Sequence, residues 1–246
     1  MGEALEAHLR RQIDHSRRFF WQRLRWRVVR SYLPKESAFA LVDVGAGAGL
    51  LGQFLAKDRP RATYAFVEPI DSLREFLRGQ YGTSADLGGY EGVYRADFVT
   101  LLDVLEHQEN DRDFLKDLVE RMTPGATLLM TVPALQTLWS QWDVALGHFR
   151  RYERSAIISC SEGLPLAIRE LSFLFPELVP LGKIRAKRRT QDTTVGESSE
   201  FPDLPGVVND ALYGLGSASL ALRHHWRTGT SLFLAATVDS SNRNGS

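Results

Sequence analysis

The stretch "FALVDVGAGAGLLG" (residues 39–52) places a short apolar run directly before a series of glycines. A continuous apolar run of this length, ended by glycines, is typical of a buried parallel strand. We expect a helix to begin near Gly49 and to run through "LLGQFLAKD", because Arg59-Pro60 interrupts the helical pattern. The sequence therefore predicts a strand, a glycine turn and a helix, the opening unit of nucleotide-binding α/β folds.

Strand patterns alternate with helical patterns over the rest of the chain. Further strands are expected at 62–68, 82–87, 97–104, 126–133, 167–175 and 230–238, with helices at 71–80, at 111–122 and from Arg154 onward. The pattern at 82–87 is the weakest of these strands. Alternation of this kind predicts a doubly wound sheet whose strands are joined by right-handed crossovers.

The two ends of the chain and one insertion differ from this pattern. Apolar residues at helical spacing and a strongly basic opposite face predict a helix over 3–33, ended by Pro34. An insertion before the last strand contains an apolar stretch (173–181), the basic run "KIRAKRR" (183–189), a polar segment "TQDTTVGESSE" (190–200) and a helical pattern. We expect the polar segment to be a flexible loop or lid. We divide the chain into a helical lead-in (1–36), an α/β domain (37–175 and 228–239), an insertion (176–227) and a frayed tail (240–246).

The composition limits the classes of function. The formal net charge of the 246 residues is zero, so no overall field favours nucleic acid as a partner. Cys160 is the only cysteine, which fits a reducing compartment. No apolar run reaches the roughly 18–20 residues of a membrane span. The histidines and Cys160 lack zinc-ligand spacing, so we expect a cytoplasmic protein without a bound metal.

The glycines can be read in two registers. Gly47, Gly49 and Gly52 satisfy the dinucleotide fingerprint, which would make the protein an NAD(P)-dependent oxidoreductase. That register leaves two residues between the strand and the first glycine, which lengthens a turn that must be tight. In the other register Gly45 follows the strand directly and Asp43 precedes it. A carboxylate at this place repels a pyrophosphate and attracts a cofactor that carries an ammonium and a sulfonium group.

A second acidic residue ends the next strand. Glu68 follows the apolar run "ATYAFV" about 20 residues after the glycine turn. A carboxylate in this position accepts hydrogen bonds from both ribose hydroxyls of an adenosine, in dinucleotides and in sulfonium cofactors alike. Glu68 therefore predicts an adenosine site without choosing the cofactor. The alternative interpretation is an ordinary surface glutamate at the end of a strand.

Four motifs together resemble the class I S-adenosylmethionine-dependent methyltransferases. These are "VDVGAGAGLL" (42–51), "FVEP" (66–69), "LLDVLEH" (101–107) and "RMTPGATLLMTVPA" (121–134). The "LLDVLEH" motif is similar to the one in methyltransferases that act on small molecules and quinone precursors. "HSRRFFWQRLR" (15–25) and "LWSQWDVALGHFRRY" (138–152) are similar to segments of a bacterial subgroup. The resemblance implies a Rossmann-like, seven-stranded sheet whose last strand is antiparallel, and S-adenosylmethionine as cofactor.

The resemblance also implies roles for individual residues. Near the methionine end of the cofactor it places Asp43, Gly45, Ala46, Gly47, Gly49, Leu102 and Asp103. Near the ribose and the adenine it places Glu68, Pro69, Ile70 and Asp86. The assignment of Asp86 is the least secure, because the loop "LGGYEGVYRA" around it departs from the family pattern. A simple turn residue is the alternative.

Methyl transfer to a hydroxyl needs a base, because the nucleophile must lose a proton. His148 in "GHFRRY" is the first candidate and His107 at the end of "LLDVLEH" the second, since an imidazole titrates near neutral pH. Asp143 could orient either ring. The alternatives are that the segment around His148 folds over the core and that His107 orients a loop.

Aromatic and basic residues suggest where an acceptor would bind. Candidates that could contact it are Phe20, Trp21, Trp139, Arg151 and Tyr152. The basic N-terminal helix has three interpretations: a solvated face, a lid led by Phe20 and Trp21, or attachment to an anionic membrane surface. The apolar and basic residues of the insertion have the same interfacial character. We therefore expect a small-molecule or lipid-linked acceptor, transfer to oxygen, and peripheral membrane contact. The remaining alternative is a protein that binds the cofactor without turnover.

Overall fold

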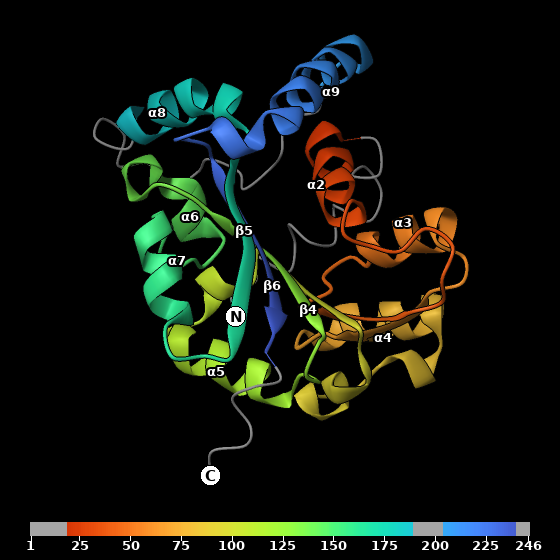
Figure 1. Ribbon diagram of the computed structural model, residues 1–246. Coiled ribbons are helices and arrows are strands. Elements are labelled where there is room, and N and C mark those ends of the chain that lie inside the picture. Colours follow the sequence, from red (N-terminus) through yellow and green to blue (C-terminus); the bar gives the residue numbers. More distant parts are fainter. Residues whose placement is uncertain (1–18, 189–203, 240–246) are drawn as a thin grey trace.

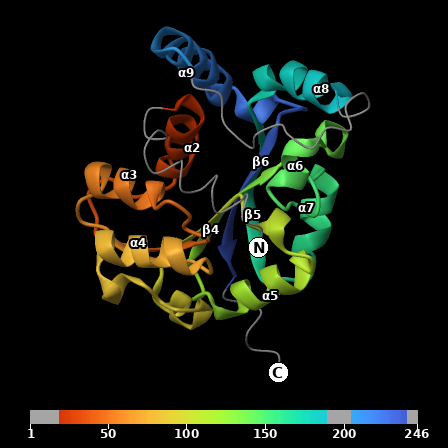
Figure 2. The ribbon, with the colours of Figure 1, turned by 180° about the vertical axis from the view of Figure 1, so that it is seen from behind.

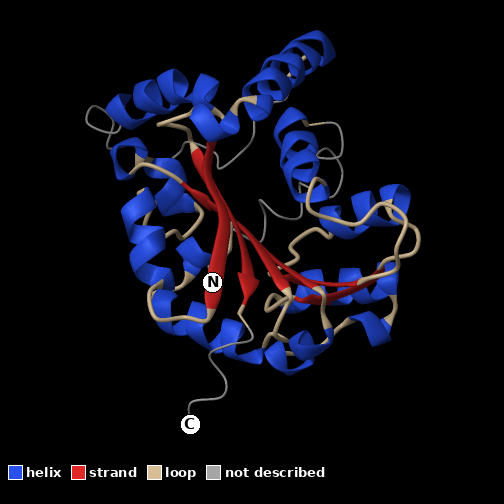
Figure 3. Ribbon diagram, viewed as in Figure 1, coloured by secondary structure: helices blue, strands red, loops and turns tan. Residues whose placement is uncertain are grey.

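The computed structural model describes residues 19–188 and 204–239 and contains a mixed six-stranded sheet (Figure 1; Figure 3). The strands lie in the order β2-β1-β3-β4-β6-β5. Their bounds are β1 (Ala40–Val44), β2 (Thr63–Val67), β3 (Phe98–Leu102), β4 (Thr127–Pro133), β5 (Leu166–Leu174) and β6 (Ser231–Val238). Strands β1 to β4 are mutually parallel, whereas β6 runs antiparallel to both of its neighbours, β4 and β5. The expected antiparallel last strand is therefore confirmed.

The expected strand at 82–87 is wrong, which is why the sheet has six strands and not seven. Residues Thr83–Ala85 form a short 3-10 helix, and only a single bridge joins Phe66 to Asp86. Gly82 and Gly88 on either side have φ angles of +86° and +67°. These left-handed conformations turn the chain away from the sheet, so a continuous ladder cannot form there.

Helices cover both faces of the sheet (Figures 1 and 2). One face packs against α5 (Asp111–Arg121) and α7 (Arg154–Ser161). The other packs against α2 (Phe20–Arg30), α3 (Leu50–Asp58) and α4 (Asp71–Tyr81). This is the doubly wound arrangement predicted from the sequence.

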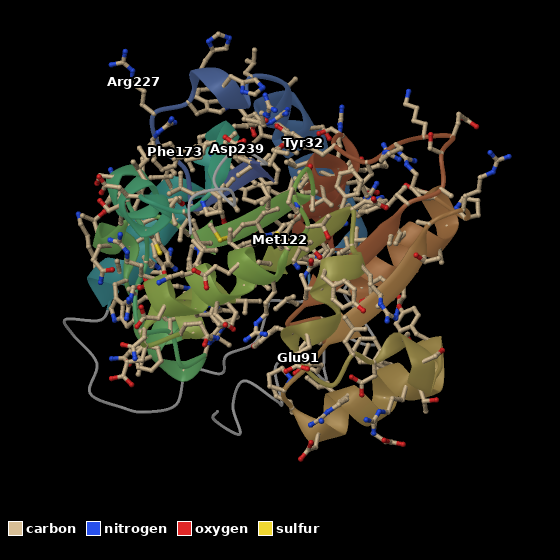
Figure 4. All side chains as sticks on the ribbon, turned by 60° about the horizontal axis from the view of Figure 1, so that its bottom comes forward. Tyr32, Glu91, Met122, Phe173, Arg227 and Asp239 are labelled. Carbon is tan, nitrogen blue, oxygen red and sulfur yellow. The ribbon has the colours of Figure 1, made fainter. Side chains whose placement is uncertain are left out.

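The side chains of β4 show how one strand serves both layers. Leu128 and Met130 point into the core beneath α5 and α7, whereas Leu129 points into the core beneath α2 and α3. Burying an aliphatic side chain of this size stabilises the fold by about 1.5–3 kcal/mol. Figure 4 shows side chains filling both layers, with the buried Met122 near the middle of the view and Arg227 at the rim.

Helix α2 packs against α9 (Gly206–Ala221), which lies far along the chain. The amide of Phe20 donates a 2.8 Å hydrogen bond to Asn209 Oδ1, and the Arg23 guanidinium lies 3.7 Å from the centre of the Tyr213 ring. Gly216 allows the close approach, because a Cβ there would lie 2.3 Å from Leu24 Cδ1. The predicted N-terminal helix is thus present from Phe20 to Arg30, while residues 1–18 lie outside the described part.

The insertion contains α8 (Val179–Arg188), α9 and two short 3-10 turns, Pro176–Leu178 and Arg223–His225. The apolar stretch 173–181 is divided between the end of β5 and the start of α8. The polar segment 190–200 and the tail 240–246 lie outside the described residues. Among the described residues, no helix is both long enough and apolar enough to cross a membrane.

Candidate active site

A cleft of about 290 Å³ opens at the carboxyl ends of the parallel strands. Ligands of open α/β sheets bind at this edge, where loops follow the strands. The lining comes from α2, the turn after β1, the ends of β2 and β3, the loops after β3 and β4, and α8. Most of the residues predicted from the sequence line this cleft, and the remainder lie elsewhere in the fold.

The turn after β1 depends on glycine. Gly45, Gly47 and Gly49 have φ angles of +72°, +55° and +70°. A Cβ at Gly45 would lie 2.5 Å from Val104 Cγ2, so a side chain there is excluded by both conformation and space. Gly45, Ala46 and Gly47 line the cleft. Gly49 precedes the first turn of α3 and packs toward Leu77, away from the cleft.

Asp43 lies in β1, just ahead of this turn, and is almost fully buried. Its carboxylate accepts hydrogen bonds from Thr100 Oγ1 (2.7 Å) and from the Tyr64 hydroxyl (3.1 Å). Burial raises the pKa of Asp43 to about 6, an effect that the two hydroxyls and the more distant Arg25 only partly offset. The cleft thus has a poorly solvated negative charge in its floor, which favours a cationic group above it.

Glu68 follows β2 and is held by the backbone on both sides. Its oxygens accept hydrogen bonds from the amides of Gly47 (2.7 Å) and Ile70 (2.9 Å). Burial raises its pKa, although these two amides oppose the shift. Pro69 and Ile70 line the cleft beside it. The carboxylate is therefore fixed in position and retains acceptor capacity for hydroxyl groups of a ligand.

Asp103, in the "LLDVLEH" motif directly after β3, has an unusual backbone conformation. Its φ of +57° is rare for a residue other than glycine, and such outliers cluster at functional sites. Thr131 Oγ1 donates a 3.0 Å hydrogen bond to one carboxylate oxygen, and Arg25 of α2 forms an ion pair with the other. Gln22 accepts a 2.6 Å hydrogen bond from the same guanidinium. Leu102 lines the cleft beside Asp103.

This set of groups fits S-adenosylmethionine better than a dinucleotide. The buried Asp43 suits an ammonium group and would repel a pyrophosphate. Glu68 suits the ribose hydroxyls of either cofactor. Arg25 supplies the one cation that a methionine carboxylate would need at this end of the cleft. Gly52, the last glycine of the dinucleotide fingerprint, lies inside α3. A Cβ there would come within 2.8 Å of the Tyr64 and Tyr81 rings, so that glycine serves packing.

Two loops form the opposite end of the cleft. His148 Nδ1 lies 3.0 Å from Asp143 Oδ1, and Arg151 Nε donates a 2.8 Å hydrogen bond to the same oxygen. Asp143 is fully buried and also accepts a 2.9 Å hydrogen bond from the amide of Ser140. These bonds to His148 and Arg151 keep the pKa of Asp143 low despite its burial. His148 is therefore oriented by a charged partner, and its ring lines the cleft.

His107 and Glu106 lie on a 3-10 turn (Leu105–His107) beside His148. The two imidazole rings meet edge to face, with centroids 4.8 Å apart. Burial, reinforced by the neighbouring His148, lowers the pKa of His107 to about 4, so this ring is neutral at physiological pH. Glu106 is 1% exposed, and burial raises its pKa well above the usual range. His107 was predicted from the sequence as a site residue, whereas Glu106 was not.

The candidate acceptor-binding residues divide into two groups. Trp21 and Arg151 line the cleft. Phe20 is buried in the core between α2 and the sheet, and Trp139 does not line the cleft, whereas Trp142 does. Tyr152 is buried beneath the loops, where its hydroxyl lies 2.8 Å from Asp111 Oδ2. Its position indicates a structural contact.

Asp86 also lies away from the cleft lining. Its carboxylate accepts hydrogen bonds from Arg78 Nε (2.7 Å) and from the amide of Gly88 (2.8 Å). In this structure the Asp86 side chain therefore organises the loop after α4.

One wall of the cleft had no counterpart among the predicted site residues. Leu178, Leu181, Gly182 and Arg185 contribute this wall from the start of α8 and the turn before it. The Arg185 guanidinium lies 5.0 Å from the centre of the Trp142 ring. The basic run of the insertion predicted a surface that contacts a membrane. Nothing in its sequence pattern indicated that this segment lines the cleft.

Comparison with known proteins decides the family. The family model described as the methyltransferase domain matches residues 6–170. The chain belongs to this methyltransferase family. The resemblance inferred from the four motifs is thereby confirmed, and with it S-adenosylmethionine as the cofactor of the family.

Individual relatives are distant. The mitochondrial ubiquinone biosynthesis O-methyltransferase of Schizosaccharomyces pombe is 29% identical over 100 residues, which are 37% of this chain and 36% of that relative. The matched stretch thus spans about a third of the curated relative.

Solved structures extend the likeness of the fold over nearly the whole chain. A chain in the complex of the Haloferax volcanii Trm112 methyltransferase activator with a candidate methyltransferase has a TM-score of 0.60 at 14% identity, covering 96% of this chain and 95% of that one. A SAM-dependent methyltransferase from Archaeoglobus fulgidus has a TM-score of 0.52 at 13% identity, covering 88% and 94%.

Proposed function

We propose that this protein transfers a methyl group from S-adenosylmethionine to an oxygen atom of a small-molecule or lipid-linked acceptor. The observation that carries the proposal is that one cleft has two ends with different chemical groups. Asp43, Glu68 and Arg25 form an end that suits the cofactor, and the Asp143-oriented His148 faces the other end. Within reach of a hydroxyl, such an imidazole is the natural proton acceptor near neutral pH.

The residues of the cofactor end would act by position and charge. Asp43 would face the ammonium group of the methionine moiety, and Arg25 its carboxylate. Glu68, held by the amides of Gly47 and Ile70, would accept hydrogen bonds from the ribose hydroxyls. When bound, the cofactor supplies a methyl group that its sulfonium already activates, so alignment and exclusion of water supply much of the rate.

The residues of the acceptor end would hold the nucleophile and take its proton. Asp143 fixes the tautomer of His148 by binding Nδ1, which leaves Nε2 as the proton acceptor. General-base catalysis of this kind contributes about 10²–10⁴-fold to the rate. Transfer to oxygen is further supported by the name of the ubiquinone O-methyltransferase that the chain resembles over 100 residues.

The lipid-linked alternative is supported by the surface near the cleft. Helices α8 and α9 both lie at the top of Figure 1, and they expose apolar residues such as Leu181, Ile184, Val207 and Leu215. The exposed Lys183 lies between the exposed apolar residues Leu181 and Ile184 of α8. Apolar and basic groups together favour an anionic lipid surface. We propose that this surface of α8 and α9 makes a peripheral membrane contact in a cytoplasmic protein. A Leu181→Ser/Ile184→Ser variant should then sediment with anionic vesicles less than the original chain does.

Three measurements test the main proposal. Titration calorimetry should detect binding of S-adenosylhomocysteine and none of NAD⁺; the reverse result would favour the oxidoreductase alternative. Mass spectrometry with labelled cofactor and a panel of hydroxylated metabolites and lipid-linked sugars should then reveal a methylated product.

His148→Ala should retain S-adenosylhomocysteine binding and lose about 10²–10⁴-fold in kcat. Cofactor binding without turnover on any acceptor would favour a non-catalytic cofactor-binding protein.

A further inference from the structure

Three potential metal ligands meet at the acceptor end of the cleft. Glu106, His107 and His148 each offer one ligand atom, and these atoms all lie within 4.8 Å of one another. Glu106 and His107 come from the turn after β3, whereas His148 comes from the loop after α6 (Gln141–Ala145). The amide of Phe149 donates a 2.8 Å hydrogen bond to the carbonyl of Glu106, which fastens the two loops together. The cluster is therefore part of the folded framework.

Both imidazoles are already oriented by a second partner. His148 binds Asp143 through Nδ1, and its Nε2 lies 4.0 Å from Glu106 Oε1. The His107 ring lies against the backbone of Gly147. His148 thus has Nδ1 held by an acceptor and Nε2 left for a ligand bond. Histidines that bind metals almost always have this arrangement, because the outer partner fixes the ring and raises its basicity.

Glu106 lacks the contacts that a buried carboxylate normally requires. Its Oε2 has no hydrogen-bond partner among the described residues, and the side chain is almost completely shielded from solvent. An unpaired buried carboxylate is strongly unfavourable unless it is protonated or meets a cation. His148 Nε2 lies 4.0 Å from the other oxygen, Oε1, which is too far for a hydrogen bond. A cation bound between the three side chains would compensate the charge of this carboxylate.

We propose that Glu106, His107 and His148 form a binding site for a divalent transition-metal ion, with Zn²⁺ as the preferred occupant. Two imidazoles and one carboxylate are a ligand set for Zn²⁺ and related ions, whereas Mg²⁺ prefers oxygen ligands alone. Zinc lies about 2.0–2.2 Å from nitrogen and oxygen ligands, so rotamer adjustments of about 1 Å would close the site. All three residues line the cleft, which leaves a coordination position open toward the acceptor.

The site extends the proposed function, and its role in methyl transfer rests on that function. An acceptor hydroxyl that binds the ion loses its proton more readily, because the metal lowers its pKa. The ion would then perform the task assigned above to His148, and His148 would act as a ligand. Metal binding itself depends only on the three side chains and requires no methyltransferase activity.

Co²⁺ and Zn²⁺ binding to the full chain tests the site directly. After dialysis against a chelator, calorimetry should show one tight Zn²⁺ site, and Co²⁺ should give the visible absorption of a four- or five-coordinate ion. Glu106→Gln and His148→Ala should each weaken Zn²⁺ binding at least 10-fold. Glu106→Gln removes a buried unpaired charge and should fold at least as well as the original chain. The exposed Glu109→Gln and His225→Ala serve as matched controls and should bind as before.

The outcomes separate the metal site from the proposed function. Unchanged Zn²⁺ affinity in Glu106→Gln and His148→Ala, equal loss in the two controls, or binding of Mg²⁺ as tight as Zn²⁺ would each overturn the metal site. Methyl transfer that survives removal of all metal would return His148 to the role of base. Failure of S-adenosylhomocysteine to bind would refute the proposed function while leaving a positive Co²⁺ result in force.

Discussion

The two ends of the cleft are built in different ways. At the cofactor end, Asp43 and Glu68 lie at the ends of the adjacent parallel strands β1 and β2. Hydrogen bonds from Thr100, Tyr64 and backbone amides satisfy their oxygens. At the acceptor end, His107 and His148 come from two loops, and Glu106 beside them retains an oxygen without a partner among the described residues. The first end is complete before any ligand arrives, whereas the second needs an added group. A rigid strand framework thus specifies the shared cofactor, and loops are left to specify the acceptor.

The largest effect should come from the turn that forms the cofactor end. Gly45→Ala should destabilise the protein by about 2–4 kcal/mol, since the left-handed φ and the contact with Val104 both oppose a side chain. Urea denaturation measures the change. Gly88→Ala is the matched control, because Gly88 has a φ of +67° but open space around it, and it should cost about 1 kcal/mol. Equal costs at both positions would mean that the close approach to Val104 is unimportant.

Removal of the ribose-binding carboxylate should be the next largest effect. Glu68→Ala should weaken S-adenosylhomocysteine binding by about 1.5–3 kcal/mol, the scale for losing hydrogen bonds to a charged group. Calorimetry measures it. Glu91→Ala on a distant 3-10 turn is the control and should bind as before. Unchanged affinity in Glu68→Ala would show that the ribose is held by other residues.

The buried charge of Asp43, which we expect to bind the cofactor, should lower the free energy of unfolding. Its pKa rises from 3.8 in the unfolded chain to about 6 in the fold, so the folded state holds the proton more tightly. Stability is therefore lost as the pH rises from about 4 to 6, and the loss persists above that range. Asp43→Asn should stabilise the protein by about 1–3 kcal/mol at pH 7 and weaken S-adenosylhomocysteine binding.

Chemical denaturation of Asp43→Asn at pH 7 and at pH 4 checks both the sign and the window. The gain in stability should shrink to near zero at pH 4, because the carboxyl of Asp43 is already neutral in the folded original protein at that pH. A variant that is less stable at pH 7, or whose advantage grows on acidification, would contradict the assignment.

The smallest effect should distinguish a structural residue from one that contacts the acceptor. Tyr152→Phe should lose about 1 kcal/mol of stability, because it removes the buried hydroxyl between Asp111 and the carbonyl of Leu105. The KM for the acceptor should not change. A raised KM for the acceptor at constant stability would return Tyr152 to the acceptor-binding residues. The acceptor site would then reach below the loops that line the cleft.

The sequence predicted the cofactor end well because its signals are local. A strand, a glycine turn and a helix are contiguous from Ala40 to Asp58, and Glu68 follows the very next strand. The expected strand at 82–87 failed because glycines with positive φ on both sides outweigh a weak apolar pattern. The helix boundaries of α3, α4 and α5 fell close to those predicted from the spacing of apolar residues.

Arg25 at the cofactor end and much of the acceptor end could not be predicted in the same way. Arg25 was one of many arginines on an amphipathic helix, and only the fold brings it to Asp103. Glu106 was a polar residue inside a recognised motif, with no signal that it would be buried without a partner. The wall formed by α8 depends on contacts between segments far apart in the sequence. Such contacts follow from tertiary packing, which no local pattern encodes.

The position of β6 has a consequence for the order in which the protein can be assembled. This strand is the last in the described chain but lies between β4 and β5. The last α-helix before it in the described chain is α9, which packs against α2. During synthesis the parallel strands β1 to β4 can pair as they emerge, while β5 has no neighbour in the sheet until residue 238 is available. A nascent chain should therefore acquire its cofactor end first and its complete cleft only after β6 has been synthesised.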